Sequence, residues 1–95
     1  MQFSPDLRPS VADGTITVSY RLWSRPKVKL GGVYRTAGVS IEVDDIDLVP
    51  FSSVTEEDLT LTGEPDREAL RRRAAHAGPI DDDTLMYRIE FHVIP

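Results

Sequence analysis

Hydrophobic and polar residues alternate most regularly near the start of the chain, over Thr15–Trp23. One face of this segment would be apolar (Ile16, Val18, Tyr20 and Leu22), and the other would carry Thr17, Ser19, Arg21 and Trp23. β-Branched and aromatic residues at a period of two are typical of strands. The pattern therefore predicts a strand over Thr15–Trp23, and Pro26 ends it because proline cannot donate to a β-ladder.

Three further segments have strand patterns: Val33–Thr36, Val39–Val49 and Leu85–Ile94. In the long middle segment the apolar positions slip by one residue at Asp44-Asp45, which predicts a β-bulge. In the last segment the alternation predicts an inward face made of Leu85, Tyr87, Ile89, Phe91 and Val93.

The helical signals are short. Residues 10–14 are predicted to form a short helical turn closed by a glycine. Thr55 and Asp58 fit a capping box, which opens a short helix that ends by Gly63. A second helix is predicted over Pro65–Ala77, with proline in its first position. In that helix Arg71, Arg72 and Arg73 would point in different directions, because successive residues are about 100° apart.

Short strands, a helical insertion and a closing strand predict an α+β fold. We expect a small, partly closed β-barrel of about five or six strands with two short helices. Ninety-five residues suffice for one modest core, so one domain covering residues 1–95 is expected.

The amino-acid composition argues against several kinds of site. With no cysteine, the chain has neither disulfides nor thiolate metal ligands. Its two histidines follow no metal-binding spacing, so neither a metal site nor a cofactor is expected. No apolar run could span a bilayer, and the first residues lack a secretory pattern, so we expect no membrane association and a cytoplasmic protein.

The formal net charge of −5 argues against wrapping a long polyanion. The charges are unevenly spread, because residues 14–40 contain five basic residues and no acid, whereas residues 41–58 contain seven acids and no base. A basic site on an acidic body suits a small anionic ligand or a short single strand. Alternatively, the two segments of opposite charge are simply neighbours in the fold.

Several motifs together resemble the ASCH domain, a member of the PUA-like group of small β-barrels linked to RNA. They are Gly-Thr-Ile-Thr-Val-Ser-Tyr-Arg-Leu-Trp, the strand containing Ile-Glu-Val-Asp-Asp-Ile, the helix start Val-Thr-Glu-Glu-Asp and the terminal Tyr-Arg-Ile-Glu-Phe. The resemblance covers nearly the whole chain, in order. It implies a PUA-like barrel that binds RNA or a modified nucleotide.

The first ASCH strand typically reads Gly-x-Lys-Thr-x-Thr-x-Arg, and here these positions begin at Gly14. Thr17 and Arg21 match, and Ser19 keeps a hydroxyl in place of the second threonine. The lysine position holds Ile16.

In ASCH members that hydrolyse acetylcytidine, that lysine, the second threonine and a glutamate after the first helix form the proposed catalytic set. The resemblance would make Ser19 the nucleophile, but Ile16 cannot move a proton. The glutamate should fall near residues 62–63, and Glu64 is displaced from there and precedes a proline. Catalysis is therefore not expected.

The sequence thus predicts a binding domain for RNA or a modified nucleotide, monomeric or weakly homodimeric. The predicted ligand-contacting residues are Thr17, Ser19, Arg21, Trp23, Arg25, Lys27 and Lys29. Trp23 would stack on a base or, alternatively, pack at the barrel rim.

Two other functions remain open. One is a divergent acetylcytidine-type amidohydrolase that uses Ser19, with Lys27 or Lys29 reaching in from the loop. The other is a protein-interaction domain that uses the acidic stretch 41–58.

Overall fold

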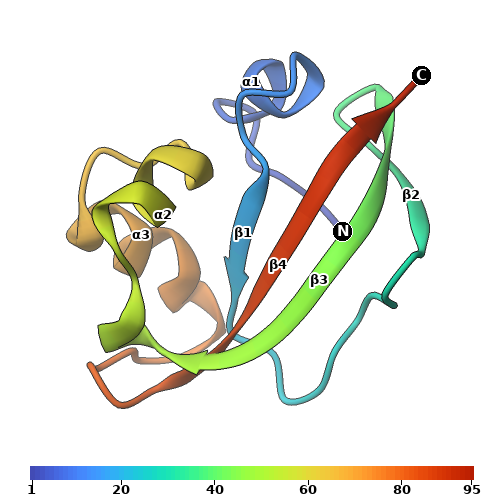
Figure 1. Ribbon diagram of the computed structural model, residues 1–95. Helices are drawn as coiled ribbons and strands as arrows, with labels where there is room; N and C mark the ends of the chain where they lie inside the picture. The colour runs from blue at the N-terminus through green and yellow to red at the C-terminus, as the bar shows by residue number, and fades with distance from the viewer.

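Four antiparallel strands form one curled sheet in the order β1-β4-β3-β2 (Figure 1). A computed structural model describes residues 1–95. The strands are β1 (Val18–Arg21), β2 (Val33–Thr36), β3 (Val39–Pro50) and β4 (Leu85–Ile94). The fold is α+β and the sheet closes only partly, as predicted, but it has four strands instead of five or six.

Strand β3 has an irregular register, which contributes to the curl of the sheet. Its register against β4 shifts between Val43 and Asp45, so that Asp44 is an extra residue. Val43 lies opposite Phe91 and Ile46 opposite Ile89, which keeps both apolar residues on one face of the sheet. The predicted bulge is therefore confirmed, and such a bulge bends its strand.

The helices are short. They are α1 (Arg8–Ala12), α2 (Glu56–Thr62) and α3 (Arg67–Ala74), with 3₁₀ turns η1 (Phe51–Ser53) and η2 (Ala75–Ala77). The capping box of Thr55 and Asp58 is present, and Gly63 ends α2 in the left-handed conformation. The second predicted helix begins later, because the Asp66 side chain accepts a hydrogen bond from the Ala69 N–H and caps α3. None of the helices is long and apolar enough to cross a membrane.

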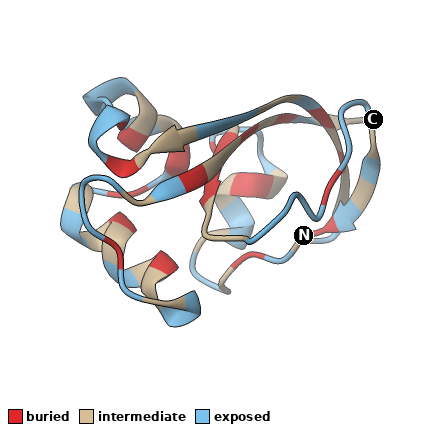
Figure 2. Ribbon diagram, turned by 90° about the horizontal axis from the view of Figure 1, so that it is seen from below, coloured by how far each residue is buried: buried red, intermediate tan, exposed pale blue.

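The buried hydrophobic residues form three groups. Figure 2 colours every buried residue red along the ribbon. One group packs the sheet against the helices: Val18, Tyr20 and Met86 with Phe51, Val54, Leu59, Leu70, Ala74 and Ile80. A second joins the N-terminal segment to the sheet: Phe3, Val11, Ile16, Ile41 and Phe91. The third consists of Val28, Val43 and Ile89, so the loop after β1 also contributes to the core.

Strand β1 is shorter than predicted. The N–H groups of Ile16 and Thr17 donate to Ser10 O and Leu61 O, so this part of the chain is tied to α1 and α2. Ile16 consequently belongs to a different buried group from Val18, instead of sharing one continuous apolar face.

The predicted inward face of β4 is wrong at its start. Leu85 is 52% exposed, whereas Met86 is fully buried. Met86 packs against the group that includes the helices, whereas Ile89 and Phe91 on the opposite face pack against the loop and the N-terminal segment. The helices pack on one face of β4 near Met86, whereas the loop and the N-terminal segment pack on the opposite face near Ile89 and Phe91. One alternating pattern therefore cannot describe the burial along the whole strand.

Candidate functional site

A cavity of about 590 Å³ lies along the outer edge of β1. Residues 2–5 of the N-terminal segment line one side, and α3 with η2 lines another. Residues 18–23 run along it between them, and Thr62 and Glu64 reach it from the end of α2. This volume falls within the range of small-molecule sites.

Some main-chain N–H and C=O groups of β1 point toward the side of the strand where this cavity lies. The register of β1 against β4 continues to Thr17 opposite Phe91, and there Phe91 N–H donates to Thr17 O while the Thr17 N–H donates to Leu61 O. This one bond fixes the phase of the antiparallel ladder. Two residues further on, Ser19 and Ile89 form a hydrogen-bonded pair. The main-chain groups of Val18 and Tyr20 therefore point away from β4, toward the open edge of the sheet.

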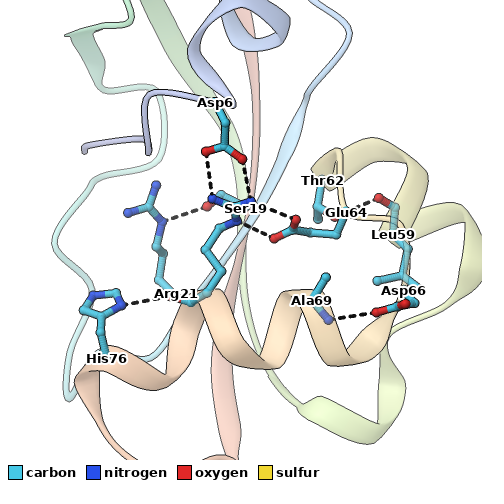
Figure 3. Close-up of polar contacts among 10 residues, drawn as sticks. Asp6, Ser19, Arg21, Leu59, Thr62, Glu64, Asp66, Ala69 and His76 are labelled. Atoms are coloured by element: carbon cyan, nitrogen blue, oxygen red, sulfur yellow. Dashed lines mark hydrogen bonds and ion pairs between the residues drawn. The ribbon is translucent and has the colours of Figure 1, made fainter.

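Ser19 and Arg21 form the polar centre of the strand (Figure 3). The Arg21 Nε donates to Ser19 Oγ at 2.7 Å, and Nη2 donates to Gln2 O at 2.6 Å. The guanidinium carbon lies 5.0 Å from the centre of the Phe3 ring and 5.9 Å from that of Trp23. Burial lowers the pKa of Arg21 from its usual value, but an arginine remains charged at neutral pH.

A second polar group centres on Arg73 of α3. Its Nε lies 2.5 Å from Glu64 Oε2, and the Glu64 side chain is only 2% exposed. Its two terminal nitrogens contact both oxygens of Asp6, at 3.1 and 2.9 Å. Hydrogen bonds to Glu64 and then to Asp6 raise the pKa of Arg73. Figure 3 shows Asp6 and Glu64 at this contact.

Ser19 has no base beside it. Its only side-chain hydrogen bond comes from Arg21, and the Glu64 carboxylate is engaged by Arg73. His76 also lines the cavity, but its Nδ1 contacts Arg73 O. The arrangement can hold a polar, negatively charged ligand, and no group is positioned to take a proton from the serine.

Comparison with solved structures identifies the architecture. An ASCH domain from Lactobacillus crispatus aligns with a TM-score of 0.72 at 19% sequence identity, over 93% of this chain and 70% of that chain. The fold is ASCH-like. Hypothetical protein PH0355 aligns with a TM-score of 0.75 at 15% identity, over 99% of this chain and 96% of that chain. Protein EF3133 from Enterococcus faecalis, of family DUF984, gives 0.73 at 15% identity, over 94% and 67%.

No protein-family model matches the sequence, and no curated protein does so either. At these sequence identities the structural likeness establishes the ASCH-like fold alone.

The ASCH-like fold brings together four of the seven residues predicted to contact a ligand: Ser19, Arg21, Trp23 and Lys27 line the cavity. Thr17, Arg25 and Lys29 do not line it. Thr17 lies just before β1, and the two basic residues are exposed in the following loop.

Three residues that line the cavity or pair with its lining were not among the predicted ligand-contacting residues: Glu64, Arg73 and Asp6. Glu64 lines the cavity even though it lies between a helix-ending glycine and a proline, a position typical of an exposed turn. Arg73 is one of three consecutive arginines, and Asp6 lies before the first predicted element. No local signal distinguishes these residues, because their contact joins segments far apart in the sequence.

At the position where the ASCH motif has lysine, Ile16 is 1% exposed and packs with Phe3 and Phe91. It does not line the cavity. The described residues include no group of three or more His, Asp or Glu side chains placed to hold a metal ion.

Proposed function

We propose that this ASCH-like protein binds the base of a nucleotide in the cavity beside β1, without hydrolysing it. The nucleotide is either a free modified nucleotide or one unit of a short RNA strand. The observation that supports this most is the composition of the cavity. Aromatic rings, the free edge of a strand and several cations line one cavity.

Each part suits a nucleotide. The unpaired main-chain donors and acceptors of Val18 and Tyr20 offer a hydrogen-bonding edge to a planar base. Trp23 offers an aromatic face, although its ring also lies 6.3 Å from that of Tyr87. Four cations line the cavity and favour an anionic ligand: Arg8, Arg21, Lys27 and Arg73. Two carboxylates oppose them, because Arg73 is paired with both Glu64 and Asp6.

Binding without catalysis agrees with the contacts of the polar groups. A serine becomes a nucleophile when a base accepts its proton, and Ser19 instead accepts a hydrogen bond from Arg21. Ile16, in the lysine position of the ASCH motif, is in the core.

One observation favours a second candidate, a divergent amidohydrolase for acetylcytidine. Glu64 and Ser19 line the same cavity, and so does Lys27. Hydrolysis would require Arg73 to release Glu64, so that the carboxylate could act as the base.

A heteronuclear NMR titration with acetylcytidine, and then with a short single-stranded RNA, tests both candidates. We expect shifts concentrated on residues 18–23 and 62–64 and no free acetate. Lys27→Gln should weaken binding severalfold, whereas Arg35→Gln, an equal charge change at an exposed site on β2, should leave it unchanged. Acetate release abolished by Ser19→Ala would establish the hydrolase instead. Absence of shifts with both ligands would refute the binding proposal.

A further inference from the structure

A second, shallower hollow adjoins the cavity. It has a volume of about 380 Å³ and is lined by Ser4, Ala69, Arg72 and Arg73. Ser4 and Arg73 also line the first cavity, so the two volumes meet at these side chains. A ligand in the first cavity could therefore extend past Arg73 into the second.

The second hollow has the chemistry of an anion site. Arg73 already holds a carboxylate with both terminal nitrogens, the two-point geometry in which arginine also binds phosphate. Arg72 is exposed, and its side chain makes no hydrogen bond or ion pair in the structure. The Ser4 hydroxyl adds a neutral donor. Arg71 takes no part, because it contacts Glu68, Ile80 O and Asp82 on another side of α3.

Asp6 fills the anion position on Arg73 from within the protein. Its side chain is 64% exposed, so it can turn into solvent without breaking a packed core. Glu64, at 2% exposure, remains paired with the Nε side of the guanidinium. When Asp6 leaves, each terminal nitrogen of Arg73 regains the hydrogen-bond donor that it gave to Asp6, while Nη2 keeps its second bond, to Glu64 Oε1 at 3.2 Å. The exposed Arg72 side chain is available beside them.

We propose that this second hollow is the phosphate subsite for the nucleotide bound in the first cavity, and that Asp6 competes with the phosphate for Arg73. The inference rests on the proposed function for the identity of the ligand in the first cavity. The shared chemistry is a phosphate group, from a mononucleotide or from an RNA backbone. Either one must displace Asp6 to bind Arg73.

Inorganic phosphate tests the subsite independently of any base. In a titration followed by the Nε–Hε signals of Arg72 and Arg73, we expect saturable shifts. Asp6→Asn should lower the apparent dissociation constant about two- to fivefold, the range expected when an exposed ion pair is removed. Arg72→Gln should raise it about tenfold. Asp83→Asn and Arg35→Gln are matched charge controls at exposed sites and should leave it unchanged.

The nucleotide measurements compare acetylcytidine with its 5′-monophosphate and with a short RNA containing the same nucleoside. Asp6→Asn should strengthen binding of the phosphorylated ligands and leave acetylcytidine unaffected. A gain for the mononucleotide alone assigns the site to a phosphomonoester, and an equal gain for the RNA assigns it to the backbone.

Failure of the proposed function and failure of the phosphate subsite would give different results. If acetylcytidine and its monophosphate leave residues 18–23 unshifted, the proposed function fails, whatever phosphate does. If inorganic phosphate produces no shift, or if Asp6→Asn and Arg72→Gln change its binding no more than their controls, the phosphate subsite is overturned, even where the nucleoside binds.

Discussion

The carboxylate of Glu64 is buried at 2% exposure and is paired with Arg73 at 2.5 Å. A buried ion pair adds little net stability, because desolvation offsets much of the attraction, but removing one partner leaves the other unpaired at a large cost. Arg73 is 32% exposed, so solvent reduces that cost here. The pair therefore serves chiefly to orient Glu64 and Arg73 at the edge of the cavity.

Removing Arg73 alone should destabilise the protein more than removing both charges. We expect Arg73→Met to lower the free energy of unfolding by about 2 kcal/mol. Arg73→Met combined with Glu64→Gln should cost less than Arg73→Met alone. Urea unfolding of the four members of this double-mutant cycle measures the coupling. Additive effects would mean that Glu64 is stabilised by something other than Arg73.

Tyr20 joins the sheet to α2 through one hydrogen bond. Its hydroxyl donates to Asp58 Oδ2 at 3.0 Å, and Arg88 Nη2 donates to Asp58 Oδ1 at 2.9 Å. Burial, followed by the hydrogen bond to Asp58, raises the pKa of Tyr20 to about 12. The protonated phenol is thus part of the native contact between β1 and the capping carboxylate of α2.

This raised pKa predicts a fall in stability at alkaline pH. The unfolded tyrosine loses its proton near pH 10 and the folded one only near 12. The stabilisation is therefore fully present below about pH 10 and is lost as the pH rises toward 12, by about 2 kcal/mol. Tyr20→Phe should flatten this fall in urea unfolding at several pH values. Tyr87→Phe, whose hydroxyl makes no protein hydrogen bond, should not, and equal slopes for both variants would contradict the prediction.

Among the elements, the end of α2 determines where the cavity residues lie. Gly63 has a φ of 78°, and a Cβ at this position would lie 2.6 Å from Ile16 Cδ1. Its neighbours Thr62 and Glu64 both line the cavity. A glycine is therefore required both for the left-handed conformation and for the close approach to Ile16.

Gly63→Ala should destabilise the protein by about 3 kcal/mol, the sum of left-handed strain and crowding in the core. Gly38→Ala is a matched control, because Gly38 has a φ of 79° but open space around it. It should cost only about 1 kcal/mol, from the backbone strain alone. Thermal unfolding of both variants measures the difference, and equal losses would show that the contact with Ile16 is easily relieved.

The elements themselves were largely predictable from local chemistry. β2 and β4 have their expected bounds, the bulge lies at the slip in the apolar pattern, and the capping box opens α2. The failures occur where tertiary contacts decide. β1 is short because Ile16 and Thr17 bond to α1 and α2, and Glu64 is buried because Arg73 reaches it from the next helix.

At the scale of the whole molecule, the charge distribution limits the size of the ligand. The protein carries a formal net charge of −5, yet four cations line the cavity beside β1. The net negative charge opposes the binding of a long polyanion, whereas the proposed nucleotide would lie among the cations that line the cavity. The proposal therefore implies a ligand about as large as the cavity and the hollow beside it.

This distribution predicts that RNA affinity does not grow with strand length. Oligonucleotides of about three and about twelve residues with one suitable nucleotide should bind equally well, because each occupies one cavity. Their affinity should depend weakly on salt, as expected when only one or two phosphates are neutralised. Fluorescence anisotropy at low and moderate salt measures both quantities. Affinity that rises with length and falls steeply with salt would instead indicate an extended basic surface, and the exposed Arg25 and Lys29 would be the first residues to test.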